Sequence, residues 1–304
     1  MKSMHLLTFK AKNESDQVGI LDKENVFSLE GLMQAYNSEN AKSLEKKKDL
    51  LSIIQNDEKS LKEIKEAWEW AQKHTDKVSS FQYNIENVDV REPISNPGKV
   101  VCVGNNYMDH CIEQNVEPPK KPMIFSKWAS CLIGNGDDIE LPEESEQVDY
   151  EVELAVVIGK KTRNITEEEA LDYVFGYTII NDVSARDIQF EDVQWVRGKS
   201  YDTFAPIGPA IVTKDEIEDP HNLGISLELN GEKLQDSNTK NLIFKIPYII
   251  SYLSKGFTFE PGDIIATGTP HGVGVFRDPQ VFLKSGDRCK LEIESIGVLE
   301  NKVR

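Results

Sequence analysis

The sequence contains no apolar run long enough to cross a membrane and no paired-cysteine motif. A spanning helix needs about 18 or more consecutive apolar residues. The apolar run IFKIPYIISYL is interrupted by Lys245 and Pro247, which favours a buried helix. The opening MKSMHLLTFKAKNESDQ lacks the apolar core of a signal peptide. Only 4 cysteines are present, without C-x-x-C spacing, so we expect reduced thiols and a cytoplasmic protein.

Positive charge is in the minority. The chain has 35 Lys and Arg against 52 Asp and Glu, a formal net charge of −17 over 304 residues. Such a field repels nucleic acid and anionic membrane surfaces, so we expect neither as a partner. An anionic substrate would need local cations, supplied by a metal ion or by Lys and Arg side chains. The charge therefore excludes partners more clearly than it identifies one.

Residues 1–90 are expected to form a small α+β domain, followed by a linker over residues 91–98 that contains two prolines and a glycine. Two strand candidates, HLLTFKA and QVGILD, precede a charged helical stretch over about residues 28–74. Apolar residues recur there at helical spacing: Leu61, Ile64, Ala67 and Trp68. We interpret this stretch as a solvated helix that packs one apolar stripe on its neighbours. A partner-binding helix is the alternative.

Residues 99–304 are expected to form a second, mainly β domain. Short apolar runs alternate with Gly, Pro and Asp, and we expect strands at VVCVG, MIFSK, YEVELAVVIG, VFGYTIIND, PIGPAIV, ISLELNG, DIIATG and CKLEIESIG. One helix is expected at ITEEEALDYVF, where Thr166 and Glu169 have capping-box spacing. Many strands with few crossover helices favour a β-rich barrel or roll over a doubly wound sheet.

Two acids, Glu151 and Glu153, lie two apart in the strand DYEVELAVVIG, so both side chains leave the same face. The apolar residues around them predict a buried strand. Like carboxylates there repel each other and lose hydration, unless they are protonated, paired with a base or bound to a metal. The pair alone leaves two interpretations open, a metal site and an edge strand with a wet acidic face. Asp149 would share this face one pleat earlier, and we leave it out.

A third acid favours the metal. Asp182 ends the apolar strand FGYTIIND, where a loop begins and ligands are common. Three carboxylates without Cys or His nearby select a hard cation, Mg²⁺, Mn²⁺ or Ca²⁺, and leave positions open for water and substrate. An Asx-turn or a helix cap is the alternative for Asp182 alone.

Of 5 histidines, only His110 has suggestive neighbours, in GNNYMDHCIEQN. On a helix Glu113 would lie beside it at i+3, where a carboxylate can fix the imidazole tautomer and raise its basicity. A surface His–Glu contact is the alternative. The proline-rich QNVEPPKKPM that follows is either a lid or a rigid surface loop.

Two further segments could supply polar contacts to a substrate. Lys199 lies in WVRGKSYDTFAPIGP and, with Arg197, could provide local positive charge. The Gly-rich turn ATGTPHGVG could cradle a carboxylate with its N–H groups and hydroxyls. It does not match the nucleotide-binding P-loop pattern.

Six segments in order resemble the fumarylacetoacetate hydrolase family, over residues from about 99 to 301. They are GNNYMDH, DYEVELAVVIGK, FGYTIINDVSARDIQ, RGKSYDTFAPIGP, FEPGDIIATGTPHGVG and LKSGDRCKLEIESIGVLEN. The similarity is greatest to bacterial single-chain members with a short N-terminal domain. It implies a mixed β-sandwich roll around a metal, usually in a homodimer, and Mg²⁺ or Mn²⁺ as the cofactor, with Ca²⁺ as an alternative.

The resemblance also implies roles for individual residues. By position, the metal ligands are Glu151, Glu153 and Asp182, and the dyad that activates water is His110 and Glu113. The implied substrate contacts are Gln189 and Lys199 for its oxygens and Thr269 for its carboxylate, while Arg186 braces the loop after Asp182. One departure from the family is Trp128, which follows the lysine of FSKWAS where many relatives have proline. It is expected near the pocket.

The implied activity is divalent-metal-dependent hydrolysis of a C–C bond in an acylpyruvate or a fumarylacetoacetate-like 1,3-diketo acid, through a metal-stabilised enolate. The family performs other reactions with the same residues, so two alternatives stand beside it: oxaloacetate decarboxylation, and isomerisation of a 2-hydroxyhepta-2,4-diene-1,7-dioate type of acid. A non-catalytic binding or regulatory protein that uses the N-terminal domain is the third alternative. In each enzymatic case the partner is a small keto acid.

Overall fold

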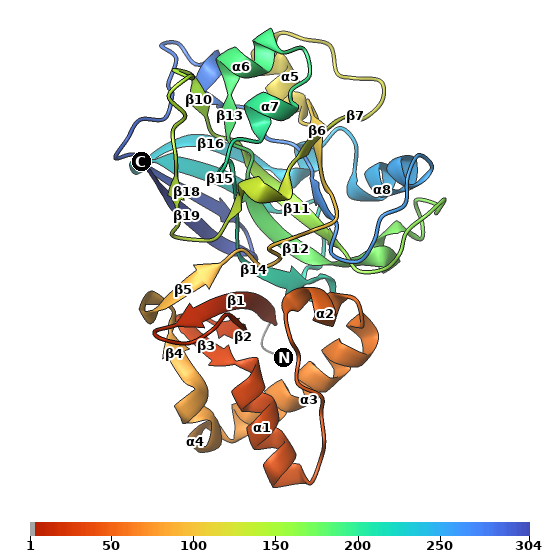
Figure 1. Cartoon of the computed structure of the whole chain (residues 1–304). Helices are drawn as coiled ribbons and strands as arrows, with labels where there is room; N and C mark the ends of the chain where they lie inside the picture. The colour runs from red at the N-terminus through yellow and green to blue at the C-terminus, as the bar shows by residue number, and fades with distance from the viewer. Residues whose placement is uncertain (1–3) are drawn as a thin grey trace.

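The computed structural model describes residues 4–304 and consists of two stacked parts. The N-terminal region, residues 4–98, lies at the bottom of Figure 1, and the C-terminal region, residues 99–304, lies above it. No helix among the described residues is long and apolar enough to span a membrane. All four cysteines are buried and unpaired, as expected for reduced thiols.

The N-terminal region contains five strands and four α-helices. Its strands are β1 (His5–Ala11), β2 (Gln17–Asp22), β3 (Asn25–Ser28), β4 (Gln82–Asn84) and β5 (Val88–Arg91). Its helices are α1 (Leu29–Asn40), α2 (Leu50–Ile54), α3 (Asp57–Lys73) and α4 (Thr75–Val78). The strands predicted at HLLTFKA and QVGILD are confirmed.

The helical stretch predicted over residues 28–74 is broken into separate helices. α1 ends at Asn40, and the next residue, Ala41, has a left-handed backbone with φ 50°. α2 begins only at Leu50, behind a capping box made by Asp49 and Ser52. The apolar stripe on α3 packs inward as predicted, since Ile64 and Ala67 are buried in a cluster shared with α1 and the sheet.

The C-terminal region is built mainly from strands. They are β6 (Val100–Gly104), β7 (Met123–Lys127), β8 (Leu132–Ile133), β9 (Asp138–Ile139), β10 (Val148–Asp149), β11 (Val152–Ile158), β12 (Val174–Asn181), β13 (Ser184–Ala185), β14 (Ala205–Thr213), β15 (Gly224–Leu229), β16 (Glu232–Asn238), β17 (Ile264–Ala266), β18 (Arg288–Ile293) and β19 (Gly297–Val303). The helices are α5 (Met108–Gln114), α6 (Arg186–Glu191), α7 (Val196–Lys199) and α8 (Ile246–Ser254).

One sheet runs through both regions, in the order β4-β3-β2-β1-β14-β12-β11-β17-β6-β7. The junction is the antiparallel pair β1–β14, in which His5 is opposite Val212 and Leu6 is opposite Ile211. Val157, Phe175 and Ile211 of the C-terminal region share a core cluster with the N-terminal helices. The domain boundary at residues 91–98 therefore stays a prediction, and the sheet itself crosses it.

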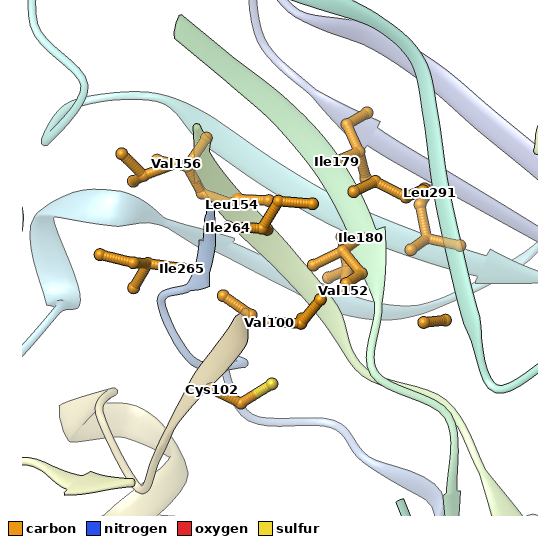
Figure 2. Packing of buried hydrophobic residues seen from close by; sticks show 14 of the residues in the cluster. Val100, Cys102, Val152, Leu154, Val156, Ile179, Ile180, Ile264, Ile265 and Leu291 are labelled. Atoms are coloured by element: carbon orange, nitrogen blue, oxygen red, sulfur yellow. The ribbon is translucent and has the colours of Figure 1, made fainter. Parts of the chain in front are cut away.

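A second sheet, in the order β16-β15-β18-β19-β9, packs against the first. Figure 2 shows Ile179 of β12 beside Leu291 of β18, where the two sheets face each other. Every residue of β11 is buried, so this strand lies at the centre of the sandwich. The predicted α+β fold, mainly β, with a mixed β-sandwich roll, is confirmed.

The helix predicted at ITEEEALDYVF is wrong. Only a short 3-10 turn forms there, over Ala170–Tyr173. The Thr166 N–H does donate to Glu169 Oε2 at 2.9 Å, but this contact closes a turn and starts no α-helix. The reason is that strand pairing takes the apolar end of the segment: Val174 opens β12 and pairs with Ile158. The buried helix expected near residues 243–253 is confirmed as α8.

Candidate active site and metal centre

Three buried carboxylates meet at one end of the strand pair β11–β12. Glu151 directly precedes β11, Glu153 lies in it, and Asp182 directly follows β12. The Asp182 N–H donates to the Glu151 carbonyl at 2.9 Å, which holds the strand ends together. One carboxylate oxygen from each acid lies within 4.8 Å of the others, and all three side chains are buried. The structure thus brings together the three acids named from the sequence.

Three basic side chains surround this cluster. Lys199 Nζ lies 2.9 Å from Glu151 Oε2 and 3.1 Å from Asp182 Oδ2. Arg186 contacts Glu151 at 2.6 Å through Nη2. Lys127, at the end of β7, places its ammonium 2.7 Å from Asp182 Oδ1 and also contacts the Lys199 carbonyl. The local cations required by the acidic chain are present.

Two of these network members were missed from the sequence. Lys127 is buried at the end of the strand MIFSK. A lysine that ends an apolar strand was the feature of the sequence that could have pointed to it. Asp149 was set aside because it lies one pleat before Glu151. It pairs with Arg186 Nε at 2.8 Å, so it steadies the guanidinium that faces Glu151. Arg186 thus links Asp149 to Glu151 and also lines the cavity, while its expected role in bracing the loop after Asp182 stays a prediction.

The two glutamates have opposite electrostatic environments. Burial opposes ionisation of Glu151, but the charges of Lys199 and Arg186 overcome it and lower its pKa to about 2. The pKa of Glu153 is raised well above its usual value, by burial first and then by repulsion from Asp182 and Glu151. The Gly268 N–H donates to Glu153 Oε2 at 2.7 Å, and no ion pair joins Glu153 to a base within residues 4–304. Glu153 is the carboxylate of the three that lacks a direct cationic partner.

This imbalance fits a divalent cation. A buried carboxylate without a positive partner is costly, and a metal ion bound between converging oxygens removes that cost. The donor set is all oxygen, which suits Mg²⁺, Mn²⁺ or Ca²⁺ better than zinc. Glu151, Glu153 and Asp182 are the residues that would hold the ion.

His110 and Glu113 face each other on α5. His110 Nδ1 lies 3.0 Å from Glu113 Oε2, and Glu113 Oε1 accepts the Gly272 N–H at 2.8 Å. With Nδ1 carrying a proton toward the carboxylate, Nε2 is the nitrogen left to exchange a proton with a ligand. α5 sits with α6 and α7 at the top of the C-terminal region in Figure 1, away from the N-terminal region.

The Gly-rich turn does cradle carboxylates, and they belong to the chain itself. The N–H groups of Gly268, Gly272 and Gly274 donate to Glu153, Glu113 and Asp149, respectively. A Cβ at Gly268 would lie 3.0 Å from the Val103 carbonyl, and its φ is 105°, so a side chain there is excluded twice. This one turn thus holds three carboxylates in place: the candidate metal ligand Glu153, Glu113 beside His110, and Asp149 beside Arg186.

A small cavity of about 70 Å³ connects these groups. The residues named from the sequence that line it are His110, Glu151, Glu153, Arg186, Gln189, Lys199 and Thr269. Its apolar wall consists of Phe125, Phe190, Trp195 and Phe276. Thr269 already bonds within the protein, because its hydroxyl donates to the Val152 carbonyl at 3.0 Å and accepts from Gln235. Two larger hollows, one beside α1 and one beside β15 and β18, contain none of these residues.

Two residues expected near the pocket lie elsewhere. Trp128, which directly follows β7, is 57% exposed and borders a different hollow beside that strand. Arg197 makes a bidentate ion pair with Asp192 at the surface instead of facing the carboxylates. The tryptophan that does line the cavity is Trp195, which the sequence did not single out.

Comparison with known proteins gives consistent relatives. Residues 99–304 match the family described as fumarylacetoacetate (FAA) hydrolase C-terminal. The mitochondrial oxaloacetate tautomerase fahd2 of Xenopus laevis is 55% identical over 219 residues, 71% of this chain and 69% of that protein. Because that relative is named as mitochondrial, a cytoplasmic location stays a prediction for this chain.

Two solved structures are similar over almost the whole length. The fumarylacetoacetate hydrolase of psychrophilic Exiguobacterium antarcticum has a TM-score of 0.80 and 34% identity, covering 99% of both chains. Maleylpyruvate hydrolase from Sphingobium, in complex with manganese(II) and pyruvate, has a TM-score of 0.76 and 28% identity, covering 99% of this chain and 98% of that one. The chain belongs to the fumarylacetoacetate hydrolase family of enzymes.

Proposed function

We propose that this chain is a divalent-metal-dependent enzyme that interconverts the enol and keto forms of oxaloacetate or a 2-oxo acid of similar size. The observation that carries the proposal is that the buried carboxylate of Glu153, which has no ion-pair partner among residues 4–304, lines the same small cavity as His110. The 55% identical relative named oxaloacetate tautomerase supports this reaction over others of the family. Mg²⁺ or Mn²⁺ is the proposed cofactor, and Ca²⁺ remains an alternative.

The basic side chains of the site would bind the acid and orient it. A divalent ion held by Glu151, Glu153 and Asp182 supplies Lewis-acid polarisation of a 2-oxo acid. Lys199 and Arg186 provide fixed positive charge at the same wall, and Gln189 supplies an amide whose oxygen accepts from Arg186 at 3.0 Å. Positive groups preorganised in a buried site stabilise a developing enolate oxygen without rearranging.

The reaction then needs one proton moved at carbon and one at oxygen. From the keto form, Nε2 of His110 accepts a proton from C3, the C–H electron pair forms the new C=C bond, and the C2=O π pair moves to the 2-oxygen, which takes a proton from solvent. In the reverse direction the 2-hydroxyl loses its proton to solvent, and His110 returns its proton to C3. Glu113 holds the Nδ1–H and stabilises the imidazolium, as a carboxylate does for a general base.

The test is the rate of enol-to-keto conversion in the metal-loaded full-length chain. We expect His110→Ala to lose about 10²–10⁴-fold in rate, the usual contribution of a general acid–base residue. Mn²⁺ affinity should be unchanged, because His110 is not one of the three proposed ligands. A His110→Ala chain that tautomerises oxaloacetate at the wild-type rate would refute the proposal.

Hydrolysis of an acylpyruvate or a fumarylacetoacetate-like acid is the second candidate. The observation that favours it is the His110–Glu113 pair at 3.0 Å, a geometry suited to deprotonating a water molecule. The solved relatives that are named hydrolases have the same overall fold. In this reaction His110 would activate water for attack on the distal carbonyl, and Lys199 and Gln189 would stabilise the oxyanion.

A side-by-side assay separates these reactions and their rivals. Oxaloacetate and a series of acylpyruvates are supplied with Mg²⁺ or Mn²⁺, and enol loss, pyruvate release and CO₂ release are recorded separately. Pyruvate from an acylpyruvate identifies hydrolysis, and CO₂ from oxaloacetate identifies decarboxylation. Slow turnover of the whole panel by a metal-loaded chain would favour a non-catalytic role. A homodimer stays part of the proposal, to be checked by light scattering.

A further inference from the structure

Aromatic side chains form part of the cavity lining, and one of them contacts Lys199. Lys199 Nζ lies 5.0 Å above the centre of the Phe125 ring, a cation–π contact. Trp195 packs edge-on against that ring, with centroids 5.4 Å apart. The carboxylate cluster, Lys199, Phe125 and Trp195 therefore follow one another in contact. Trp195 is the outermost of them and still lines the cavity.

Trp195 reaches this position because β6 ends in a glycine. A Cβ at Gly104 would lie 2.8 Å from Cζ3 of the Trp195 indole and 2.9 Å from Cε of Met123. Carbon atoms do not approach so closely without one of them moving. The missing side chain at Gly104 is thus what lets the indole lie over the end of the strand and against the cavity.

The remaining apolar lining is more open. Phe190 is 55% exposed and Phe276 is 38% exposed, so both border the mouth. Trp195 is only partly exposed and fills space that a longer ligand would need. A cavity of about 70 Å³ is small beside the several hundred Å³ typical of ligand pockets. The indole is the largest side chain that limits it.

We propose that Trp195, seated on Gly104, sets the length limit of the ligand. It admits 2-oxo acids of oxaloacetate size and excludes those with a longer or bulkier tail. This inference rests on the proposed function, because it takes the 2-oxo acid end of the ligand to lie at the carboxylates and Lys199. The tail then points along Phe125 and ends against the indole.

Binding measurements on the Mn²⁺-loaded full-length chain test this limit without relying on turnover. Calorimetry compares pyruvate with 2-oxo acids of increasing tail length, up to phenylpyruvate. In the wild type, affinity should fall as the tail lengthens. In Trp195→Ala the ratio of long-tail to pyruvate affinity should rise about tenfold or more, the effect of one or more methylenes in an apolar pocket. The matched control is Trp128→Ala, which removes an indole outside the cavity and should keep the wild-type ratio.

A second variant protects the test against misfolding of the first. Gly104→Ala introduces the methyl group that the indole excludes, so it should change the same ratio in an otherwise intact chain. In a Trp195→Ala background the methyl has only the flexible end of Met123 to displace. Gly104→Ala should then have little further effect, and the non-additivity measures the contact.

The outcomes separate the length limit from the proposed function. Equal affinity ratios in the wild type, Trp195→Ala and Trp128→Ala would overturn the length limit alone. A wild-type chain that binds short 2-oxo acids with the expected ratio, but turns over neither oxaloacetate nor acylpyruvates, would overturn the proposed function alone. If no 2-oxo acid binds to the metal-loaded wild type, both are wrong.

Discussion

Two ion pairs, one in each region, show how differently the same chemistry acts in the two parts of the molecule. Lys77 and Glu39 of the N-terminal region are 3.1 Å apart, with side chains 47% and 46% exposed. Lys127 and Asp182 beside the candidate site are 2.7 Å apart and fully buried. Water screens the first pair and cannot reach the second. In the first pair the charges remain at the solvated surface, and in the second they are part of the core.

Breaking the buried pair should have the largest effect on stability. Lys127→Met removes a cation from Asp182 and a donor from the Lys199 carbonyl, leaving buried acceptors unpaired. We expect a loss of about 3–5 kcal/mol in the free energy of unfolding, measured by denaturant titration. Lys77→Met is the matched control and should unfold at the wild-type denaturant concentration. Equal midpoints for both variants would contradict the contrast between the regions.

Truncation of a buried side chain at the β1–β14 junction tests whether the two regions unfold together. Leu6 is fully buried in β1 opposite Ile211 of β14. Leu6→Ala should cost about 2–5 kcal/mol, as buried leucine truncations do. Since one sheet crosses the junction, we expect a single transition, with circular dichroism and tryptophan fluorescence changing together. Two separated transitions, of which only one moves in the variant, would show that the regions are independent units.

Substitution of Glu153 should have a smaller effect on the free energy of unfolding, and it should stabilise the protein. Because the pKa of Glu153 is raised, its ionisation opposes folding at pH values above its ordinary pKa. In the metal-free chain, Glu153→Gln should therefore raise the free energy of unfolding at neutral pH by about 1 kcal/mol or more. The gain should shrink as the pH falls toward the ordinary pKa of a glutamate, where the unfolded chain also becomes protonated.

With added Mn²⁺ the wild type should become more stable than Glu153→Gln. Metal binding to the folded state raises the free energy of unfolding of the wild type. Glu153→Gln replaces one of the three carboxylate ligands with a neutral amide, so its free energy of unfolding should rise less. Asp149→Asn is the comparison, because Asp149 is a buried acid of the same network that pairs with Arg186 and is outside the proposed ligand set. A Glu153→Gln chain stabilised by Mn²⁺ as strongly as the wild type would remove Glu153 from the metal site.

The sequence was most informative where structure is local. The spacing of Glu151 and Glu153 follows from the two-residue repeat of a strand, and Asp182 marks the end of the next one, so the acidic cluster could be named from the residues alone. The apolar alternation likewise predicted most of the strands. The failed helix at ITEEEALDYVF shows the limit: its last residues pair with Ile158 of a neighbouring strand, a partner that no local pattern reveals.

What could not be predicted depends on contacts between distant segments. Lys127 lies 55 positions before its partner Asp182. Gly272, whose N–H donates to Glu113, lies 159 positions after Glu113. The position of Trp195 depends on a missing side chain at Gly104. Trp128, which the family resemblance placed near the pocket, borders a different hollow, because the chain leaves β7 directly before it.

The smallest expected effect is a pH dependence with one source in each region. His221 of the C-terminal region accepts the Ile246 N–H through Nε2 at 3.2 Å, which requires a neutral ring. Burial lowers its pKa, and the charge of Lys245 adds to this while Asp219 opposes it. The unfolded chain then takes up a proton before the folded one, so stability is lost as the pH falls from the ordinary histidine pKa through the lowered one. His221→Gln keeps an acceptor and should flatten this slope.

His5, in β1, has a pKa lowered mainly by burial, with Asp22 opposing, so its sign is the same. If the two regions unfold as one unit, His5→Gln and His221→Gln should each flatten the slope of the same transition, and the double variant should add the two reductions. If the regions unfold separately, each substitution should act only on the transition of its own region. Denaturant titrations between pH 5 and 8 (about the range in which histidine titrates) measure both slopes. A slope unchanged in both variants would mean that other groups govern the acid side of stability, and that the exposed charges of the N-terminal region matter more than their screening suggests.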